Sequence, residues 1–160
     1  MMTIEYTPIG VIRTPWQEPQ GMPIQPPGGA DAAGTVEVFG DYADGLKDLE
    51  GFSHVILLYH FHRNGGYSLQ VTPFMDTVPR GIFAIRAPRR PNPIGLSVVQ
   101  LDRRDGAVLH VHGVDMLDGT PLIDIKPFVP EFDAPKATRT GWLEQARKGV
   151  AGHRSDDRFQ

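Results

Sequence analysis

Apolar and polar residues alternate along several short stretches of the chain, a pattern typical of β-strands with one buried face. In "TVEVF", residues 35–39, Val36 and Val38 fall on the same side because successive strand residues point in opposite directions. The stretch "SHVILLYHFHR", residues 53–63, is almost continuously apolar, which predicts a strand buried for most of its length. Both stretches are expected to contribute side chains to a core.

A hairpin is the clearest local prediction. The runs "GLSVVQL" and "AVLHVH" are joined through Asp105-Gly106, a pair suited to the positive φ angles of a tight turn. In the last predicted strand, Leu122 and Ile125 are three positions apart, so strict alternation does not place them on the same face. Further strands are predicted within "IEYTPIGVIRT" (4–14), "YSLQVTP" (67–73), "RGIFAIRAP" (80–88) and "TPLIDIKPFVP" (120–130).

Predicted helices are short. Residues 41–52, "DYADGLKDLEGF", read as a helical turn that ends near Gly51, and residues 141–149, "GWLEQARKG", as one short helix. No strand is regularly followed by a long helix, which argues against a doubly wound α/β sheet. The expected fold class is mainly β, an antiparallel sheet that closes into a barrel with short helices at its periphery.

Composition narrows the class of protein. A chain of 160 residues suits one domain, and 18 glycines with 15 prolines require frequent turns. The segment 15–34 has no periodicity and predicts a long loop, either disordered or functional. The sequence contains no cysteine, no apolar run long enough to span a bilayer and no secretion signal. We therefore expect a cytoplasmic protein that does not insert into membranes.

The stretch "RAPRRPNPIG", residues 86–95, combines three arginines with three prolines. The net charge of −3 gives no global attraction to nucleic acid, so RNA binding would depend on local arginine clustering. Prolines lower the entropy lost when such a loop is ordered, which favours a rigid cationic loop for an anionic partner over a solvated rim. The cluster comprises Arg80, Arg86, Arg89, Arg90, Arg103 and Arg104.

Other polar groups are weaker candidates. Asp118-Gly119 predicts a turn that exposes backbone amides. Asp124 and Lys126 share one strand face, where they could form a pair or point into a site. His60 with His62 and His110 with His112 form H-x-H pairs that would need a third ligand to bind a metal, so we expect no metal site. Motifs for nucleotide hydrolysis or covalent catalysis are absent from the sequence.

Four blocks together resemble the TsaA-like, or TrmO, family of single-sheet β-barrel methyltransferases. They are "PIGVIRTP" (8–15), "GFSHVILLYHFHR" (51–63), "IRAPRRPNPIGLS" (85–97) and "DGTPLIDIKPF" (118–128). The resemblance implies a homodimeric barrel that binds S-adenosyl-L-methionine and methylates the exocyclic nitrogen of threonylcarbamoyladenosine in tRNA. It also implies a barrel domain over 1–135, with a short helix and tail over 136–160, in a short form without the C-terminal extension of long members.

The resemblance carries the family's cofactor contacts onto several segments of this chain. They fall on Pro23, Ile24, Gln25, His62, Arg63, Arg86, Leu96, Leu117, Asp118, Gly119 and Thr120. In this reading Leu96 packs on the adenine, Arg86 meets the methionine carboxylate, and the turn offers amides and a carboxylate. Prolines hold the "NPIG" backbone rigid, while Arg89 and Arg90 are free to contact RNA phosphates.

The implied reaction is a direct in-line displacement in which the adenosine nitrogen attacks the sulfonium methyl group. The protein would mainly align the reacting atoms, and a base could remove the nitrogen's proton; Asp124 and His62 are the candidates. Three alternatives stay open at this point. They are a non-catalytic RNA-binding barrel, a methyltransferase that uses the same donor on another small substrate, and a metal-dependent enzyme built on the H-x-H pairs.

Overall fold

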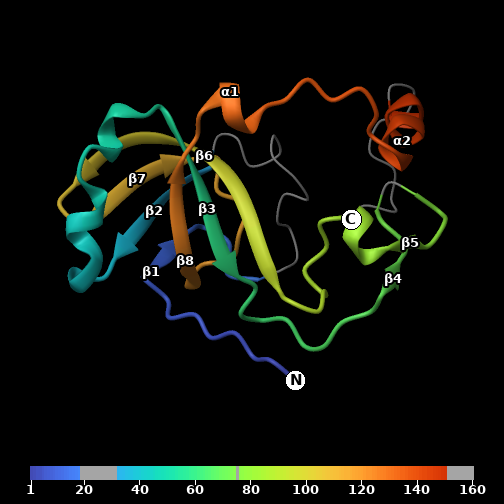
Figure 1. Ribbon diagram of the computed structural model, residues 1–160, viewed down its shortest axis with the longest axis horizontal. Coiled ribbons are helices and arrows are strands. Elements are labelled where there is room, and N and C mark those ends of the chain that lie inside the picture. Colours follow the sequence, from blue (N-terminus) through green and yellow to red (C-terminus); the bar gives the residue numbers. More distant parts are fainter. Residues whose placement is uncertain (19–31, 75, 151–160) are drawn as a thin grey trace. The chain divides into compact units, whose positions relative to one another are not determined.

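The computed structural model describes residues 1–18, 32–74 and 76–150 (Figure 1). Its contacts divide the chain into two compact units, which we call the barrel unit (Met1–Asn64 with Pro93–Phe128) and the second unit (Gly65–Asn92 with Val129–Gln160). The strands are β1 (Gly10–Arg13), β2 (Ala33–Val38), β3 (His54–His60), β4 (Gln70–Val71), β5 (Arg80–Gly81), β6 (Ile94–Asp105), β7 (Val108–His112) and β8 (Thr120–Pro127). The helices are the 3₁₀-helices η1 (Gly40–Leu46), η2 (Leu49–Gly51) and η3 (Ile82–Ala84) and the α-helices α1 (Pro130–Asp133) and α2 (Trp142–Val150).

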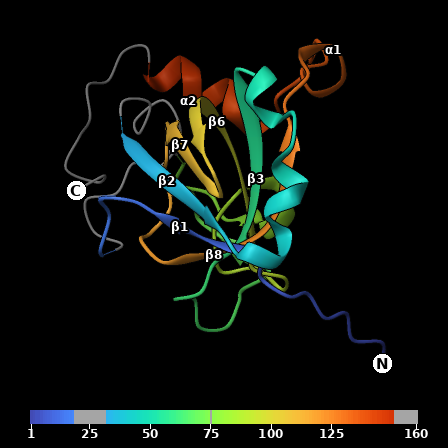
Figure 2. The same cartoon turned by 90° about the vertical axis from the view of Figure 1, so that its left-hand side faces the viewer.

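The strands of the barrel unit close into a barrel in the order β1-β2-β7-β6-β3-β8 (Figures 1 and 2). Every neighbouring pair is antiparallel, and β8 closes the ring by pairing with both β1 and β3. Closure leaves none of these strands with an unpaired edge. The predicted fold class, a mainly β single-sheet barrel with short helices around it, is confirmed.

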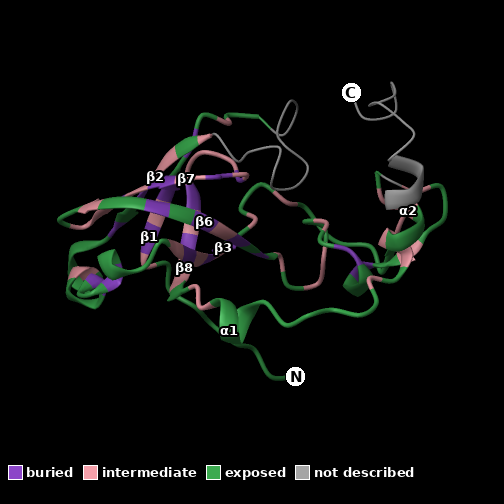
Figure 3. Ribbon diagram, turned by 90° about the horizontal axis from the view of Figure 1, so that it is seen from above, coloured by how far each residue is buried: buried purple, intermediate pink, exposed green. Residues whose placement is uncertain are grey.

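Inward-facing side chains fill the barrel, and Figure 3 shows the buried positions concentrated on its strands. Val36 and Val38 are both buried on β2, as the alternation predicts. On β3 the burial alternates: Val55, Leu57 and Tyr59 are buried while the residues between them are only partly covered. Within the apolar run at 53–63, the strand His54–His60 thus has one fully buried face, while its other face is partly covered up to the exposed His60.

A β-bulge explains why Leu122 and Ile125 are out of phase. Leu58 lies opposite Asp124 and Tyr59 lies opposite Leu122, so Ile123 is the extra residue of β8. One inserted residue shifts the alternation to the other face. As a result Leu122 is fully buried and Ile125 also packs against the core, although they are three positions apart.

The predicted hairpin is confirmed. Asp105 pairs with Val108, so the loop contains only Gly106 and Ala107. Gly106 has a φ of +61°, whereas Ala107 is not among the positive-φ residues, the pattern of a type II′ turn with glycine at its first central position.

Several predicted strands are shorter than expected. Only Gly10–Arg13 of the stretch 4–14 is a strand, and β2 begins at Ala33, inside the predicted loop 15–34. The stretches 67–73 and 80–88 contribute two residues each, β4 and β5, and η3 follows β5 directly. Prolines near both segments lack the amide hydrogen that would extend the ladder.

Side chain and backbone contacts organise the second unit. The Trp142 indole nitrogen donates to the Ala84 carbonyl at 2.8 Å, and the Ile82 amide donates to the Leu69 carbonyl at 2.9 Å. Arg80 forms an ion pair with Asp76 at 2.6 Å, and this hydrogen bond is the main reason why the pKa of Asp76 is lowered. The predicted division at residue 135 stays a prediction. Among the described residues, no helix is long and apolar enough to cross a membrane.

Candidate functional site

Three of the segments that the sequence singled out leave the barrel at the same end. Ile12 pairs with Thr120, Tyr59 with Leu122, and His60 with Ile94. These pairings bring the end of β1, the end of β3 and the start of β8 to one rim, which we call the Thr120 end. The loops that follow β1 and β3, and the loop that precedes β8, all begin or end there.

The predicted turn at residues 117–120 is bound tightly to the end of β1. The Asp118 carboxylate accepts a hydrogen bond from the Thr14 amide at 3.0 Å, and the Asp118 amide donates to the Trp16 carbonyl at 2.7 Å. The Gly119 amide donates to the Ile12 carbonyl at 2.9 Å, and Gly119 has a φ of +81°. The expectation that this turn offers these two amides to a ligand is therefore wrong, because both are used inside the protein.

Arg63 lies beside the same short segment as Asp118. Its guanidinium donates to the Gln17 backbone carbonyl at 3.0 Å and lies 3.6 Å from the Glu18 carboxylate. The side-chain amide nitrogen of Gln17 is 3.5 Å from an Asp118 carboxylate oxygen. Two of the predicted cofactor segments thus meet at residues 16–18. The predicted contacts Pro23, Ile24 and Gln25 lie outside the described residues, a few positions further along the chain.

His62, the neighbour of Arg63, is exposed at the Thr120 end. Partial desolvation lowers its pKa, and the nearby charges of Arg63 and His60 lower it further. A lowered pKa favours the neutral imidazole.

Leu96 points outward from the barrel wall. It lies opposite Leu58 on β3 and is 50% exposed, while its neighbours Gly95 and Ser97 face the interior and are buried. An exposed leucine offers an apolar surface at this position. Its predicted contact with an adenine ring stays a prediction.

The arginine-rich loop belongs to the second unit. One Arg90 nitrogen donates to the carbonyls of Ile85 and Ala87, at 2.9 and 3.2 Å, so this side chain fastens its own loop. The expectation that the Arg90 side chain is free to contact RNA phosphates is wrong, because one of its guanidinium nitrogens is bound to backbone oxygens. Arg86 and Arg89 are exposed and form no ion pair with any residue of the ranges 1–18, 32–74 and 76–150.

The remaining arginines of the cluster are paired with carboxylates. Arg80 pairs with Asp76, as described above, and Arg103 lies 3.1 Å from Asp105. Arg104 lies 3.3 Å from Glu50. Only part of the cluster therefore remains available to an anionic partner.

Asp124 is already bound by two other groups of the protein. Its carboxylate pairs with Lys126 at 2.9 Å and accepts a hydrogen bond from the Ile125 amide. The sequence left open a pair or side chains that point into a site, and the structure shows the pair of Asp124 with Lys126.

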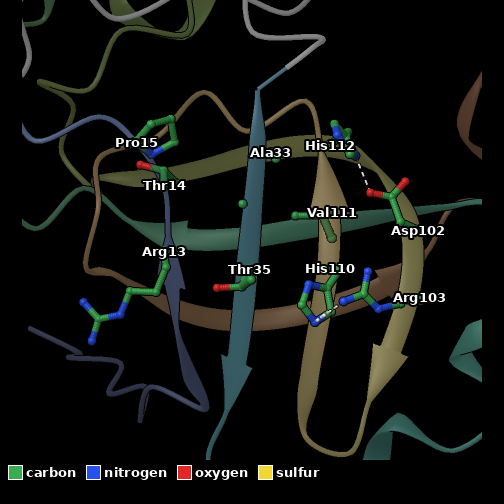
Figure 4. Close-up of a pocket in the computed structure, with 11 residues that line it drawn as sticks. Arg13, Thr14, Pro15, Ala33, Thr35, Asp102, Arg103, His110, Val111 and His112 are labelled. Atoms are coloured by element: carbon green, nitrogen blue, oxygen red, sulfur yellow. Dashed lines mark hydrogen bonds and ion pairs between the residues drawn. The ribbon is translucent and has the colours of Figure 1, made fainter.

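A shallow groove of about 420 Å³ crosses the outer surface of β1, β2, β7 and β6 (Figure 4). Arg13, Arg103, His110 and His112 line it, but Asp102 bonds His112, and Asp105 bonds both His110 and Arg103. Arg13 is likewise paired with Glu37 and Asp118. Both arginines of the groove are thus already paired with carboxylates, which disfavours phosphate binding there.

Neither histidine pair belongs to a larger group of potential metal ligands among the described residues. No group of three potential protein ligands is assembled anywhere within residues 1–18, 32–74 and 76–150. His110 and His112 are on the groove described above, where their partners are aspartates of β6.

A buried polar chain at the Thr120 end was missed by sequence reasoning. The Tyr59 hydroxyl lies 2.8 Å from the Ser97 hydroxyl, which donates to the Asp115 carboxylate at 2.6 Å. Burial raises the pKa of Asp115. One signal was present in the sequence: Ser97 occupies an inward position of an apolar strand, and Asp115 lies between Val114 and Met116, which are both buried.

Comparisons with known proteins agree with this architecture. The family model of the tRNA-methyltransferase O N-terminal domain matches residues 11–134. A probable S-adenosyl-L-methionine-binding protein of Pyrococcus abyssi is 52% identical over 158 residues, which cover 99% of this chain and 86% of that protein. The Escherichia coli tRNA (adenine(37)-N6)-methyltransferase is 38% identical over 140 residues, which cover 81% of this chain and 60% of that enzyme.

Solved structures show the same relationship. A crystal structure of TrmO from Pseudomonas aeruginosa superposes with a TM-score of 0.75 at 40% identity, and the match covers 90% of this chain and 63% of that one. This chain thus spans less than two thirds of the TrmO chain and of the Escherichia coli enzyme. Because the family model matches most of the sequence, the chain belongs to the tRNA-methyltransferase O N-terminal domain family.

Proposed function

We propose that this chain binds S-adenosyl-L-methionine and transfers its methyl group to the exocyclic nitrogen of threonylcarbamoyladenosine in tRNA. The observation that carries the proposal is the meeting of Arg63 and the turn 117–120 at residues 16–18. The names of the relatives support both the donor and the kind of acceptor.

The chemistry of the Thr120 end fits this donor. S-adenosyl-L-methionine has an apolar adenine face, a carboxylate and a cationic sulfur. Leu96 offers exposed apolar surface for the adenine. Arg63 is half exposed and carries further N–H donors that suit the donor's carboxylate. When bound, the donor supplies a methyl group that its positive sulfur has already activated.

The protein's own contribution is therefore alignment. Arg63 and Asp118 hold residues 16–18 from two sides, which positions the start of the loop that contains the predicted contacts Pro23, Ile24 and Gln25. Fixed orientation of two reactants contributes several kcal/mol to the lowering of a barrier.

The direct test is incubation of the protein with isotopically labelled methyl donor and tRNA that lacks the modification. We expect label in the nucleoside derived from threonylcarbamoyladenosine. Label in another nucleoside would reject the acceptor but keep the methyltransferase, whereas RNA binding without any transfer would favour a non-catalytic RNA-binding barrel.

Replacing Arg63 with alanine should weaken S-adenosyl-L-methionine binding about tenfold. Loss of one hydrogen bond from a charged donor costs about 1.5–3 kcal/mol, part of which is recovered by water at this half-exposed position. Isothermal titration calorimetry measures the change. Arg104→Ala is a matched control because Arg104 also forms one ion pair, with Glu50, and its affinity should equal that of the wild type.

Arg89→Ala should weaken tRNA binding and leave the affinity for the methyl donor unchanged. An arginine that neutralises one phosphate contributes about one unit to the slope of log affinity against log salt concentration. Filter-binding titrations at several salt concentrations measure this slope. Arg86→Ala tests the predicted cofactor contact, and this variant should keep the wild-type salt slope for tRNA binding. If Arg86→Ala and Arg89→Ala had equal effects on tRNA binding and on donor binding, the assignment of Arg86 to the donor and of Arg89 to tRNA would be contradicted.

We further propose that the active protein is a homodimer. Large apolar side chains are exposed on the second unit, with Phe83 77%, Leu69 62% and Phe74 61% exposed, and burying such side chains against a second copy of the chain would be favourable. Sedimentation velocity should give twice the mass of 17.7 kDa, and a monomer at micromolar concentration would refute the dimer.

A further inference from the structure

Tyr59, Ser97 and Asp115 form a hydrogen-bond chain whose direction is fixed by chemistry. An ionised carboxylate can only accept hydrogen bonds, so the Ser97 hydroxyl must donate to Asp115. The Ser97 oxygen then remains as the acceptor for the Tyr59 hydroxyl. Both hydroxyls are buried on the inner faces of β3 and β6, so they hold the carboxylate from inside the barrel.

The carboxylate itself is at the Thr120 end. Asp115 lies two residues before the turn 117–120, in the loop between β7 and β8, and is only partly buried. Within the described ranges, Ser97 is the one side chain that hydrogen-bonds to it. The carboxylate can therefore accept a further proton or hydrogen bond from a group at this end of the barrel.

The surroundings of Asp115 favour proton uptake. Desolvation raises its pKa, and the hydrogen bond from Ser97 opposes this shift only in part. Among the described residues no charged side chain contributes to the shift, and Tyr59 on β3 is the titratable group of the chain that leads to it. A carboxylate with a raised pKa is a better base than an ordinary one.

Other polar groups at or near this end are less suitable. Asp118 binds the Thr14 amide and is paired with Arg13, and Asp124 is paired with Lys126. His62 is exposed, without a hydrogen bond that would orient its ring among those described.

We propose that Asp115 accepts the proton that the acceptor nitrogen loses during methyl transfer, and that Ser97 and Tyr59 are positioning residues for its carboxylate. The inference rests on the proposed function. The nitrogen–carbon bond forms as the carbon–sulfur bond breaks, the electron pair of that bond passes to sulfur, and the N–H proton passes to Asp115. The carboxylate becomes a neutral acid, so no other reactant is needed.

Asp115→Asn should lower kcat by about 100-fold or more, the usual contribution of a general base, with the dissociation constant of S-adenosyl-L-methionine changed less than twofold. Asp105→Asn, at the hairpin turn between β6 and β7, is the matched control and should keep full activity. A carboxylate that merely bound the donor would instead lose affinity by a factor similar to the loss in kcat, which would overturn the proposal.

Thermal stability provides a readout independent of activity. Because the folded-state pKa of Asp115 is raised, the protonated form is favoured by the fold, and stability is lost as the pH rises through that pKa. Asp115→Asn removes this cost, so its Tm at neutral pH should equal or exceed that of the wild type. A clearly lower Tm would indicate a structural role and count against Asp115 as the base.

The pH profile of kcat identifies the titrating group. Activity should rise with pH as Asp115 ionises, and this rise should be absent in Asp115→Asn. Ser97→Ala removes the hydrogen bond that stabilises the ionised form, so the rise should move to higher pH, and Tyr59→Phe should move it less in the same direction. NMR titration of the Asp115 carboxyl carbon, in the proteins without ligands, should show the same order of pKa values: wild type lowest, then Tyr59→Phe, then Ser97→Ala.

The outcomes separate this inference from the proposed function. A wild-type protein that binds the donor but methylates no tRNA would contradict the proposed function, and the base assigned for it would fall too. An active wild type with an equally active Asp115→Asn variant, or with an unshifted profile in Ser97→Ala, would contradict the role of Asp115 alone.

Discussion

Replacing Gly95 with alanine is expected to lower the free energy of unfolding by about 3 kcal/mol, the upper range for overpacking a core. A Cβ at this inward position would lie 2.2 Å from Cε2 and 2.5 Å from Cζ of Tyr59, and 2.9 Å from Cζ of Phe61. The two rings pack edge to face with centroids 5.6 Å apart. Neither ring can yield without disturbing the other, so the barrel wall itself must shift.

Thermal unfolding measures this effect. For a chain of this size, about 3 kcal/mol corresponds to a Tm decrease of about 6–12 °C. Gly45→Ala is the matched control, because a Cβ there meets no atom within 4 Å and Gly45 does not have a positive φ. A Tm for Gly95→Ala within two degrees of the control would contradict a clash between the new methyl group and the two rings.

Double variants identify the clash. Tyr59→Phe keeps the ring atoms that a Cβ at position 95 would meet, so Gly95→Ala with Tyr59→Phe should be no more stable than Gly95→Ala with the tyrosine. Tyr59→Leu removes those ring atoms, so it should reduce the cost of Gly95→Ala. The resulting coupling energy, expected within the range of about 0.5–3 kcal/mol for residues in contact, would assign the destabilisation to this ring.

The barrel could be predicted because its strands obey a local rule. Alternation at Val36 and Val38 and the turn residues at Asp105-Gly106 depend only on neighbours in the chain. The short pair β4 and β5 could not be predicted in the same way, because apolar residues there have few ladder partners and prolines interrupt them. The bulge at Ile123 was visible only as a phase error between Leu122 and Ile125.

The sequence indicated which residues belong to the candidate site, but not which of them contact one another. The sequence blocks indicated Arg63 and the turn 117–120, but not that both meet residues 16–18, since Asp118 and Thr14 are 104 positions apart. The role of Arg90 was misjudged because its acceptors are carbonyl oxygens, which have no sequence signature. Asp115 was missed for a related reason: its partner Ser97 is on another strand.

Asp118→Ala is expected to lower the free energy of unfolding by about 2 kcal/mol and to weaken S-adenosyl-L-methionine binding by more than tenfold. The carboxylate satisfies the partly buried Thr14 amide, and an unsatisfied buried donor costs about 1–3 kcal/mol. Its loss also removes the contact with Gln17. Residues 16–18 would then be held by Arg63 and by the backbone hydrogen bond from residue 118 to the Trp16 carbonyl.

Asp118→Asn separates the two roles of this carboxylate. The asparagine oxygen can still accept from Thr14, while the charge that faces Arg13, 3.8 Å away, is removed. Because that ion pair is partly exposed, its loss should cost less than about 1 kcal/mol. We therefore expect Asp118→Asn to retain most of the stability and most of the donor affinity, measured by thermal unfolding and calorimetry. If asparagine instead loses as much affinity as alanine while its Tm stays near that of the wild type, the carboxylate charge contacts the donor directly, and the turn is a ligand-binding element and not only a support for residues 16–18.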